Sequence, residues 1–218
     1  MIDLHHHSNH SDGKATVEEL LKKAIETGIA VMSITDHDTL AGQEKASFVA
    51  NLMGIKYIHG IELSTQFDNK SVHLLGYFAK LPSKNARSKL DKYLLNLQVK
   101  RMRAKRECKS EEISMPIKDA LEFIKSQNGF AILPHPILYY DRLDYLLPLV
   151  DGIEAVYPSH SEYFISEMVG EAESRGLFVT SGSDLHGTIR SKEFDLILAK
   201  YGEFTNGFIE KFFGRLIP

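Results

Sequence analysis

Apolar and polar residues are arranged in two alternating patterns along the first third of the chain. In one pattern, apolar residues recur every three or four positions, which is the spacing of an amphipathic helix. In the other, they form continuous runs of strand length, as in strands that are buried on both faces. The predicted elements alternate as strand, helix, strand, helix and strand at residues 1–4, 16–28, 29–34, 42–53 and 56–61. Short connections between such elements predict parallel α/β units.

The pattern changes after residue 62. Residues 67–70 form a turn signal and residues 71–77 a further strand, which predicts a β-hairpin with the preceding strand. Residues 82–110 are highly charged, with leucines at helical intervals. The predicted elements that follow are a helix opened by Ser114–Pro116 that runs to Gln127, strands at 130–133, 152–156 and 177–180, a helix at 161–175 and a C-terminal packing helix with Phe204, Phe208, Phe212 and Phe213.

Composition places the chain among ordinary globular proteins. Its 218 residues suit one domain, and 43% hydrophobic and 25% charged residues allow a core of useful size. A net charge of −3 provides no global attraction for nucleic acid. The single cysteine, Cys108, excludes a disulfide within the chain and a zinc site built on cysteines. Because no apolar run has the length of a membrane span and no signal-peptide pattern is present, we expect a soluble, cytoplasmic protein.

Histidines and carboxylates are concentrated near the start of the chain, between Asp3 and Gly13. Side chains two positions apart on a strand point the same way, so His5 and His7 can bind one ion while His6 faces elsewhere. An expression tag or a polar loop with accidental histidines would also explain this stretch by itself. The rest of the chain favours the metal interpretation.

Further candidate ligands lie at or near the ends of the predicted strands. Taken alone, each has a structural alternative, such as a hydrogen-bonded histidine, a helix-capping glutamate or a turn aspartate. Their repetition in successive units favours a common site, because the carboxyl ends of parallel strands share one face of a sheet or barrel. The candidates are His5, His7, His37, Glu62, His73, His135, Asp184 and His186.

Imidazole and carboxylate donors without thiolates suit zinc, manganese or iron. The donors outnumber the needs of one four-coordinate ion, which indicates a multinuclear site. Glu62 is the candidate bridging ligand, since a carboxylate can join two metals and an imidazole cannot. Two metals about 3.5–4 Å apart would share a hydroxide and hold an anionic substrate for in-line attack.

Five motifs together resemble the polymerase-and-histidinol-phosphatase (PHP) superfamily. They are Asp3–Ser8 with Ser11–Gly13, Ile34–Thr39, Gly60–Glu62, His135–Pro136 and Gly182–Gly187. Within the superfamily, the chain is most similar to small phosphoesterases that act on nucleoside 3′,5′-bisphosphates or short RNA. The resemblance implies an α/β fold, a distorted (β/α)7 barrel with its metal site at the C-terminal ends of the strands. It also implies a single domain over residues 1–218, with a short helical excursion at about 80–114.

The resemblance further implies two or three divalent metals (Mn, Zn or Fe) and their ligand sets. One metal would take His5, His7, Glu62 and Asp184; a second Asp12, His37 and His186; a third Glu62, His73 and His135. Glu62, Asp12 and His37 are thereby the expected catalytic residues, together with His160 as a substrate contact or leaving-group acid.

The chain departs from its nucleotide-processing relatives in the segment that would contact the substrate. Nucleotide-processing relatives carry a longer helical insertion, often with an Arg-Pro-His element that is missing here. Phosphate contacts are therefore sought at Arg190, Lys192, Lys14 or the basic run 100–109, although that run also fits a solvated helix face. His10 is a further candidate substrate contact.

The predicted function is hydrolysis of phosphomonoesters or short nucleotide phosphodiesters by a metal-dependent phosphoesterase. A nucleotide or another phosphorylated small molecule, or short RNA, is the expected partner, with no membrane and no obligate protein partner. One alternative is a small-metabolite phosphatase similar to histidinol phosphatase, and another is a non-catalytic metal-binding module. A metal-dependent amide hydrolase is disfavoured, because such enzymes commonly bridge metals with a carboxylated lysine and no lysine lies at a predicted strand end.

Overall fold

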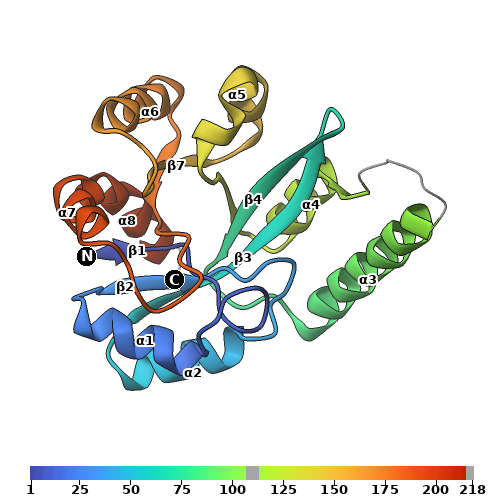
Figure 1. The fold of residues 1–218 in the computed structure, drawn as a ribbon, viewed down its shortest axis with the longest axis horizontal. Helices are drawn as coiled ribbons and strands as arrows, with labels where there is room; N and C mark the ends of the chain where they lie inside the picture. Colours follow the sequence, from blue (N-terminus) through green and yellow to red (C-terminus); the bar gives the residue numbers. More distant parts are fainter. Residues whose placement is uncertain (107–112, 215–218) are drawn as a thin grey trace.

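The computed structural model describes residues 1–106 and 113–214. Seven strands follow one another around a single curved sheet (Figure 1). In spatial order they are β1 (Ile2–Asp3), β2 (Val31–Ile34), β3 (Lys56–Phe67), β4 (Lys70–Phe78), β6 (Phe130–Leu133), β7 (Gly152–Val156) and β8 (Phe178–Ser181). The two-residue strand β5 (Met115–Pro116) pairs with β3 beside this path.

Hydrogen bonds between the two ends of the sheet bring it close to a barrel. Leu4 N donates to Ser181 O at 2.9 Å, and Ser181 Oγ donates to Ile2 O at 2.9 Å. All strands along the path pair in parallel except β4, which is antiparallel to both β3 and β6. The predicted distorted α/β barrel is therefore confirmed.

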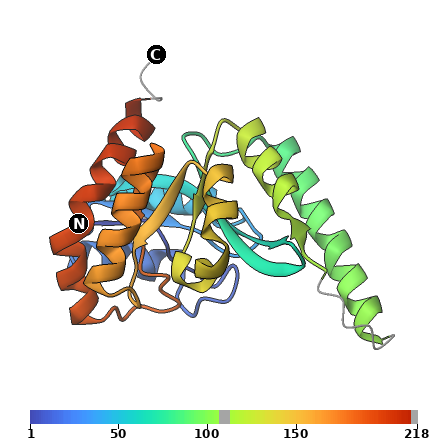
Figure 2. The ribbon, with the colours of Figure 1, turned by 90° about the horizontal axis from the view of Figure 1, so that it is seen from above.

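Helices surround the barrel in chain order. They are α1 (Val17–Glu26), α2 (Gln43–Leu52), α3 (Lys84–Arg106), α4 (Ile117–Ser126), α5 (Leu143–Leu146), α6 (Glu162–Arg175), α7 (Lys192–Tyr201) and α8 (Asn206–Gly214), with short 3-10 helices η1 (Pro136–Arg142), η2 (Leu147–Leu149) and η3 (Gly202–Thr205). Figures 1 and 2 show α3 extending beyond the barrel beside α4. Within the described residues, no helix is both long and apolar enough to cross a membrane.

Local sequence signals account for several helix ends. Thr16 and Glu19 form the expected capping box at the start of α1. Ser161 caps α6, and Gly176 ends that helix in the left-handed conformation that glycine adopts without strain. The predicted helix at 82–110 corresponds to α3, and residues 107–110 lie outside the described residues.

Strand β3 is longer than predicted. It continues six residues beyond Ile61, because β4 pairs with it from His59 to Phe67. Asp68 and Asn69 form the turn between them, both with positive φ, as two-residue hairpin turns require. Glu62 therefore lies inside a strand and not at its end, which corrects the sequence-based placement.

The C-terminal helix α8 closes one end of the barrel. Phe208 and Phe212 are buried among residues at the starts of strands, including Val31 of β2 and Phe130 of β6. This confirms the predicted packing helix, although Phe204 lies in η3 and is exposed. Since α8 covers the ends where the parallel strands begin, the opposite end is left for the candidate ligands.

Candidate metal centre

The nine predicted ligands converge at one end of the barrel. Each has a nitrogen or oxygen atom within 3.4 Å of a donor atom of another member of the set. They come from β1 and the loop after it (His5, His7, Asp12), the end of β2 (His37), β3 (Glu62), β4 (His73), the end of β6 (His135) and the loop after β8 (Asp184, His186).

Two of these residues, His73 and Glu62, do not lie at the carboxyl end of a parallel strand. His73 lies near the start of β4, and because β4 is antiparallel, its start lies at the end where its neighbours finish. Glu62 lies where the ladder between β2 and β3 ends in an isolated bridge with His37. Both side chains are therefore placed at the same end as the others.

Glu62 occupies the centre of the cluster and is 1% exposed. Its Oε2 atom lies 3.1 Å from both His5 Nε2 and His7 Nε2, whereas Oε1 lies 2.9 Å from His73 Nδ1 and 3.2 Å from His135 Nε2. Burial alone would raise the pKa of this carboxyl, but His5 and hydrogen bonds from the surrounding imidazoles hold it well below its usual value. Oε2 also lies 3.4 Å from His37 Nδ1, so the two oxygens face different sets of imidazoles, as a bridging ligand requires.

The donor atoms fall into three overlapping groups, each within 4.8 Å. The first contains the same four residues as the first predicted ligand set. The second adds His7 to Asp12, His37 and His186, and the third combines Glu62 and His73 with His37. His135 contacts Glu62 but is absent from these groups, so its role in the third set stays a prediction.

The chemistry of the cluster fits divalent cations. His7 Nε2 lies 3.1 Å from oxygens of both Glu62 and Asp184, yet it makes no hydrogen bond with a described residue. Nδ1 atoms of His37 and His135 are likewise buried without one. Ligands bound at about 2.1 Å to one cation lie roughly 3.0–3.4 Å apart, close to these separations. The donors are therefore spaced as ligands around one ion would be, and the separations of Glu62 from His5 and His135 also fit hydrogen bonds.

A buried carboxylate that sequence reasoning missed supports two of the histidines. Glu154 Oε1 accepts a hydrogen bond from His5 Nδ1 at 2.9 Å, and Oε2 accepts one from His135 N at 2.9 Å. The first bond fixes the orientation of the ring, so that Nε2 faces Glu62 Oε2 at 3.1 Å. Burial lowers the pKa of His5, but the carboxylates of Glu154 and Glu62 outweigh it and raise the pKa well above its usual value.

Strand β7 supplies this support through a β-bulge between Glu154 and Val156. The extra residue brings Glu154 and Tyr157 to the same face, although they are three positions apart. Tyr157 Oη donates to Asp184 Oδ2 at 3.0 Å. Gly182 makes room for the arrangement, since a Cβ there would lie 2.1 Å from Glu154 Oε1. Although β7 carries none of the nine ligands, it orients three of them.

Backbone conformation is unusual at two candidate ligands. His135 and Asp184 have φ angles of 34° and 50°, in the left-handed region that non-glycine residues rarely occupy. Such strain persists only where surrounding contacts hold it, and it is common at functional sites. At His135 and Asp184, those contacts include the bonds from β7.

The predicted substrate contacts are placed less favourably. His160 is 3% exposed, donates Nδ1–H to Ala155 O at 2.8 Å, and has its pKa lowered by burial to about 4. A neutral imidazole at pH 7 argues against a leaving-group acid. The buried guanidinium of Arg190 pairs with Asp3 and Asp195, which favours a structural role. His10 is exposed, and residues 107–109 of the basic run lie outside the described residues.

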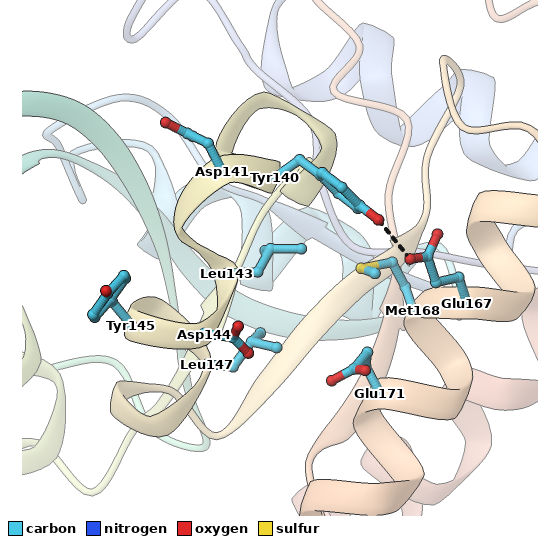
Figure 3. A pocket seen from close by; sticks show the side chains of 9 residues that line it. All are labelled: Tyr140, Asp141, Leu143, Asp144, Tyr145, Leu147, Glu167, Met168 and Glu171. Atoms are coloured by element: carbon cyan, nitrogen blue, oxygen red, sulfur yellow. Dashed lines mark hydrogen bonds between the residues drawn. The ribbon is translucent and has the colours of Figure 1, made fainter.

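A pocket of about 240 Å³ between η1–α5 and α6 contains none of the nine ligands (Figure 3). Four carboxylates line it, from Asp141, Asp144, Glu167 and Glu171. Tyr140 Oη donates to Glu167 at 2.8 Å across its edge. This lining would repel a phosphate, so the pocket is not a candidate substrate site for the metal cluster.

Comparisons with known proteins found a related phosphatase and a related exoribonuclease. The chain is 25% identical to a 3′,5′-nucleoside bisphosphate phosphatase of Chromobacterium violaceum, over 85% of this chain and 87% of that protein. It is 40% identical to a 5′-3′ exoribonuclease of Haemophilus influenzae over 74 residues, which cover 34% of this chain and only 27% of the exoribonuclease.

Two solved structures share the fold. An amidohydrolase from Chromobacterium violaceum superposes with a TM-score of 0.71 at 24% identity, covering 85% of this chain and 87% of that one. A proposed metal-dependent phosphoesterase of Bifidobacterium adolescentis gives a TM-score of 0.70 at 20% identity, covering 91% and 95%. The PHP domain model matches residues 3–133, which is more than half of the sequence, and the chain therefore belongs to the PHP domain family.

Proposed function

We propose that this chain is a metal-dependent phosphoesterase that hydrolyses nucleotide-type phosphate esters. The observation that carries the proposal is the cluster of imidazoles and carboxylates around Glu62, whose donors are spaced as neighbouring ligands. Membership of the PHP domain family supports the reaction class. The names of the bisphosphate phosphatase and the exoribonuclease to which the chain is similar support the substrate class.

Two or three divalent cations would be held by the sets predicted from the sequence, with His7 or His37 as additional donors. The nitrogen and oxygen donors suit manganese, zinc or iron. The chemistry that such cations supply is polarisation of the phosphoryl oxygens and activation of water at neutral pH.

The residues of the cluster and their supports have separate roles in bridging the donor groups, positioning the ligands and giving access to solvent. Glu62 joins the donor groups, and Glu154 and Tyr157 hold His5, His135 and Asp184 in position. Asp12 is 55% exposed, whereas Glu62 is buried. The cluster is therefore most accessible to water and substrate at Asp12 and the neighbouring His186. The Asp12 carboxyl is ionised at neutral pH, because His37 and His186 lower its pKa although its partial burial acts in the opposite direction.

Phosphate release from a panel of substrates tests the proposal. The panel contains a nucleoside 3′,5′-bisphosphate, short 5′-phosphorylated RNA, a mononucleotide and histidinol phosphate, each with added manganese. Preference for the bisphosphate or RNA is the expected result, and turnover confined to histidinol phosphate would move the assignment to a metabolite phosphatase.

Glu62→Gln is the matched variant for this assay. It keeps the size of the side chain but removes the bridging charge, so we expect a folded protein with activity reduced at least a hundredfold. Glu171→Gln on α6, which removes an exposed carboxylate away from the cluster, is the control. Wild-type protein that binds metal but releases phosphate from no substrate would leave the non-catalytic metal-binding module.

A further inference from the structure

The metal cluster is most open to solvent at Asp12 and His186, and less so at His73, which is 30% exposed. Glu62, His5 and His7 are buried, whereas Asp12 is 55% and His186 is 39% exposed. The most exposed approach for a substrate whose phosphate reaches the cluster therefore lies beside Asp12 and His186.

A cleft of about 580 Å³ begins at His186 on this open side. One wall follows Asp12 in the sequence and contains Lys14, and the other is the loop after His186. The backbone bond from Lys14 N to His186 O, 2.9 Å long, holds the two walls together. Cavities of this volume are typical of small-molecule sites.

The lining of this cleft combines a cation with an apolar surface. Lys14 is exposed, and its ammonium forms no ion pair or hydrogen bond with any side chain or backbone group that the structure describes. Glu19, the cleft's carboxylate, accepts hydrogen bonds from Thr16 N and Oγ1 in the α1 capping box. Ile189, 86% exposed, provides an apolar surface together with Leu185.

Other clefts suit an anionic substrate less well. A cleft of about 360 Å³ between Asp38 and α3 also carries Asp91, and the guanidinium of its cation, Arg101, already bonds Ser114 Oγ and Ile113 O. The pocket in Figure 3 is lined by four carboxylates. Among these three, only the cleft beside His186 combines an unpaired cation with contact to the metal cluster.

We propose that the cleft between Lys14 and Ile189 binds the nucleoside portion of a nucleoside bisphosphate. Lys14 pairs with the phosphate that is not hydrolysed, the base packs against Ile189 and Leu185, and the other phosphate lies at the cluster. The assignment rests on the proposed function, because the cluster must bind the reacting phosphate. It names the part of this chain that distinguishes a bisphosphate from a simple phosphomonoester.

Kinetics with three substrates test the cleft: adenosine 3′,5′-bisphosphate, adenosine 5′-monophosphate and p-nitrophenyl phosphate. For Lys14→Ala we expect the ratio of KM for the bisphosphate to KM for p-nitrophenyl phosphate to rise about tenfold, as loss of a charge-assisted hydrogen bond predicts. Ile189→Asp, a change at an exposed side chain, should raise the KM for both nucleotides relative to p-nitrophenyl phosphate. Lys22→Ala on α1 is the control, since Lys22 is exposed and does not line the cleft.

Calorimetric binding of adenosine 3′,5′-bisphosphate to the same proteins separates this inference from the proposed function. If wild-type protein hydrolyses none of the substrates but binds the bisphosphate, and Lys14→Ala binds it about tenfold more weakly, the phosphoesterase proposal fails and the cleft stands. An unchanged KM ratio with unchanged affinity in Lys14→Ala overturns the cleft. Wild-type protein that does not bind the bisphosphate also overturns it.

Discussion

At the scale of single residues, the candidate ligands and their supports differ in how visible they are in the sequence. Histidines that directly follow apolar runs are easy to recognise as candidate ligands, because the packing of an apolar strand does not require a histidine at its end. Glu154 lies within the apolar strand Gly152–Val156, and nothing in the sequence signals that a bulge turns it towards His5 and His135. Its role depends on contacts between residues 149 positions apart, which only the folded chain brings together.

Replacing Glu154 tests this support directly. Glu154→Gln keeps the size of the side chain, but its amide places an N–H group among the donors from His5 and His135. We expect metal affinity to fall about 10–100-fold, as is usual when the partner of a metal-binding histidine is lost. Competition with a chelator measures the affinity, and circular dichroism checks the fold. Glu167→Gln on α6 is the matched control, and equal affinity in both variants would contradict the expectation.

His160 provides a test based on pH. Burial lowers its pKa in the folded state to about 4, from about 6.5 in an unfolded chain. The neutral imidazole stabilises the fold fully above pH 6.5, and this contribution is lost as the pH falls towards 4, because the unfolded chain then binds the proton first.

In urea unfolding, the free-energy difference between wild type and His160→Gln should therefore shrink by about 2–3 kcal/mol from pH 7 to pH 4.5. Comparing the two proteins at each pH cancels the titration of the other histidines. A difference that does not depend on pH would contradict the burial of a neutral His160.

At the scale of elements, strands and long helices were predictable and short connecting helices were not. Strands β6 and β7 have the bounds predicted from the sequence, because strands that are covered on both faces are mostly apolar, with Glu154 of β7 as the exception. The sequence pattern predicts no element at 137–149, where the structure has η1, α5 and η2. These segments are too short for helical periodicity, and packing of Leu143, Leu146 and Leu147 holds them.

Replacing two glycines by alanine should change the stability of the protein in opposite directions. A Cβ at Gly182, after β8, would lie 2.1 Å from Glu154 Oε1 and 2.4 Å from His5 Cβ, so Gly182→Ala should destabilise the protein by about 2 kcal/mol or more. Gly170 lies inside α6 with open space around it, so Gly170→Ala should stabilise by about 0.5–1 kcal/mol. Thermal or urea unfolding of both variants measures the two effects. Similar effects from both substitutions would contradict the close approach at Gly182.

At the scale of the whole molecule, the cluster joins the two ends of the sheet. His5 and His7 follow β1, whereas Asp184 and His186 follow β8. His7 Nε2 lies 3.1 Å from Asp184 Oδ1, and the rings of His7 and His186 are stacked with their centroids 4.2 Å apart. A cation held by these groups would therefore add to the backbone hydrogen bonds that join the two ends of the sheet, such as Leu4 N to Ser181 O and His7 N to Leu185 O.

Removal of metal should accordingly lower the thermal stability of the whole chain. A ligand present at a hundred times its Kd stabilises the folded state by about 2.7 kcal/mol. For a protein of this size, that corresponds to a fall in Tm of roughly 5–10 °C on treatment with a chelator. Scanning calorimetry before chelation, after it and after manganese is restored measures the effect. A Tm that chelation does not change would argue against ions at the junction.

The junction between β1 and β8 also determines when the cluster can assemble during translation. His5 is synthesised 181 positions before His186. At typical rates of protein synthesis this interval is on the order of 10–40 seconds. Throughout it, the histidines of the nascent N-terminus lack the partners that would complete their coordination. The complete ligand set therefore forms only after the final strand has been synthesised. An ion bound earlier by His5 and His7 would be retained or exchanged according to which metal ions are available when Asp184 and His186 join the site.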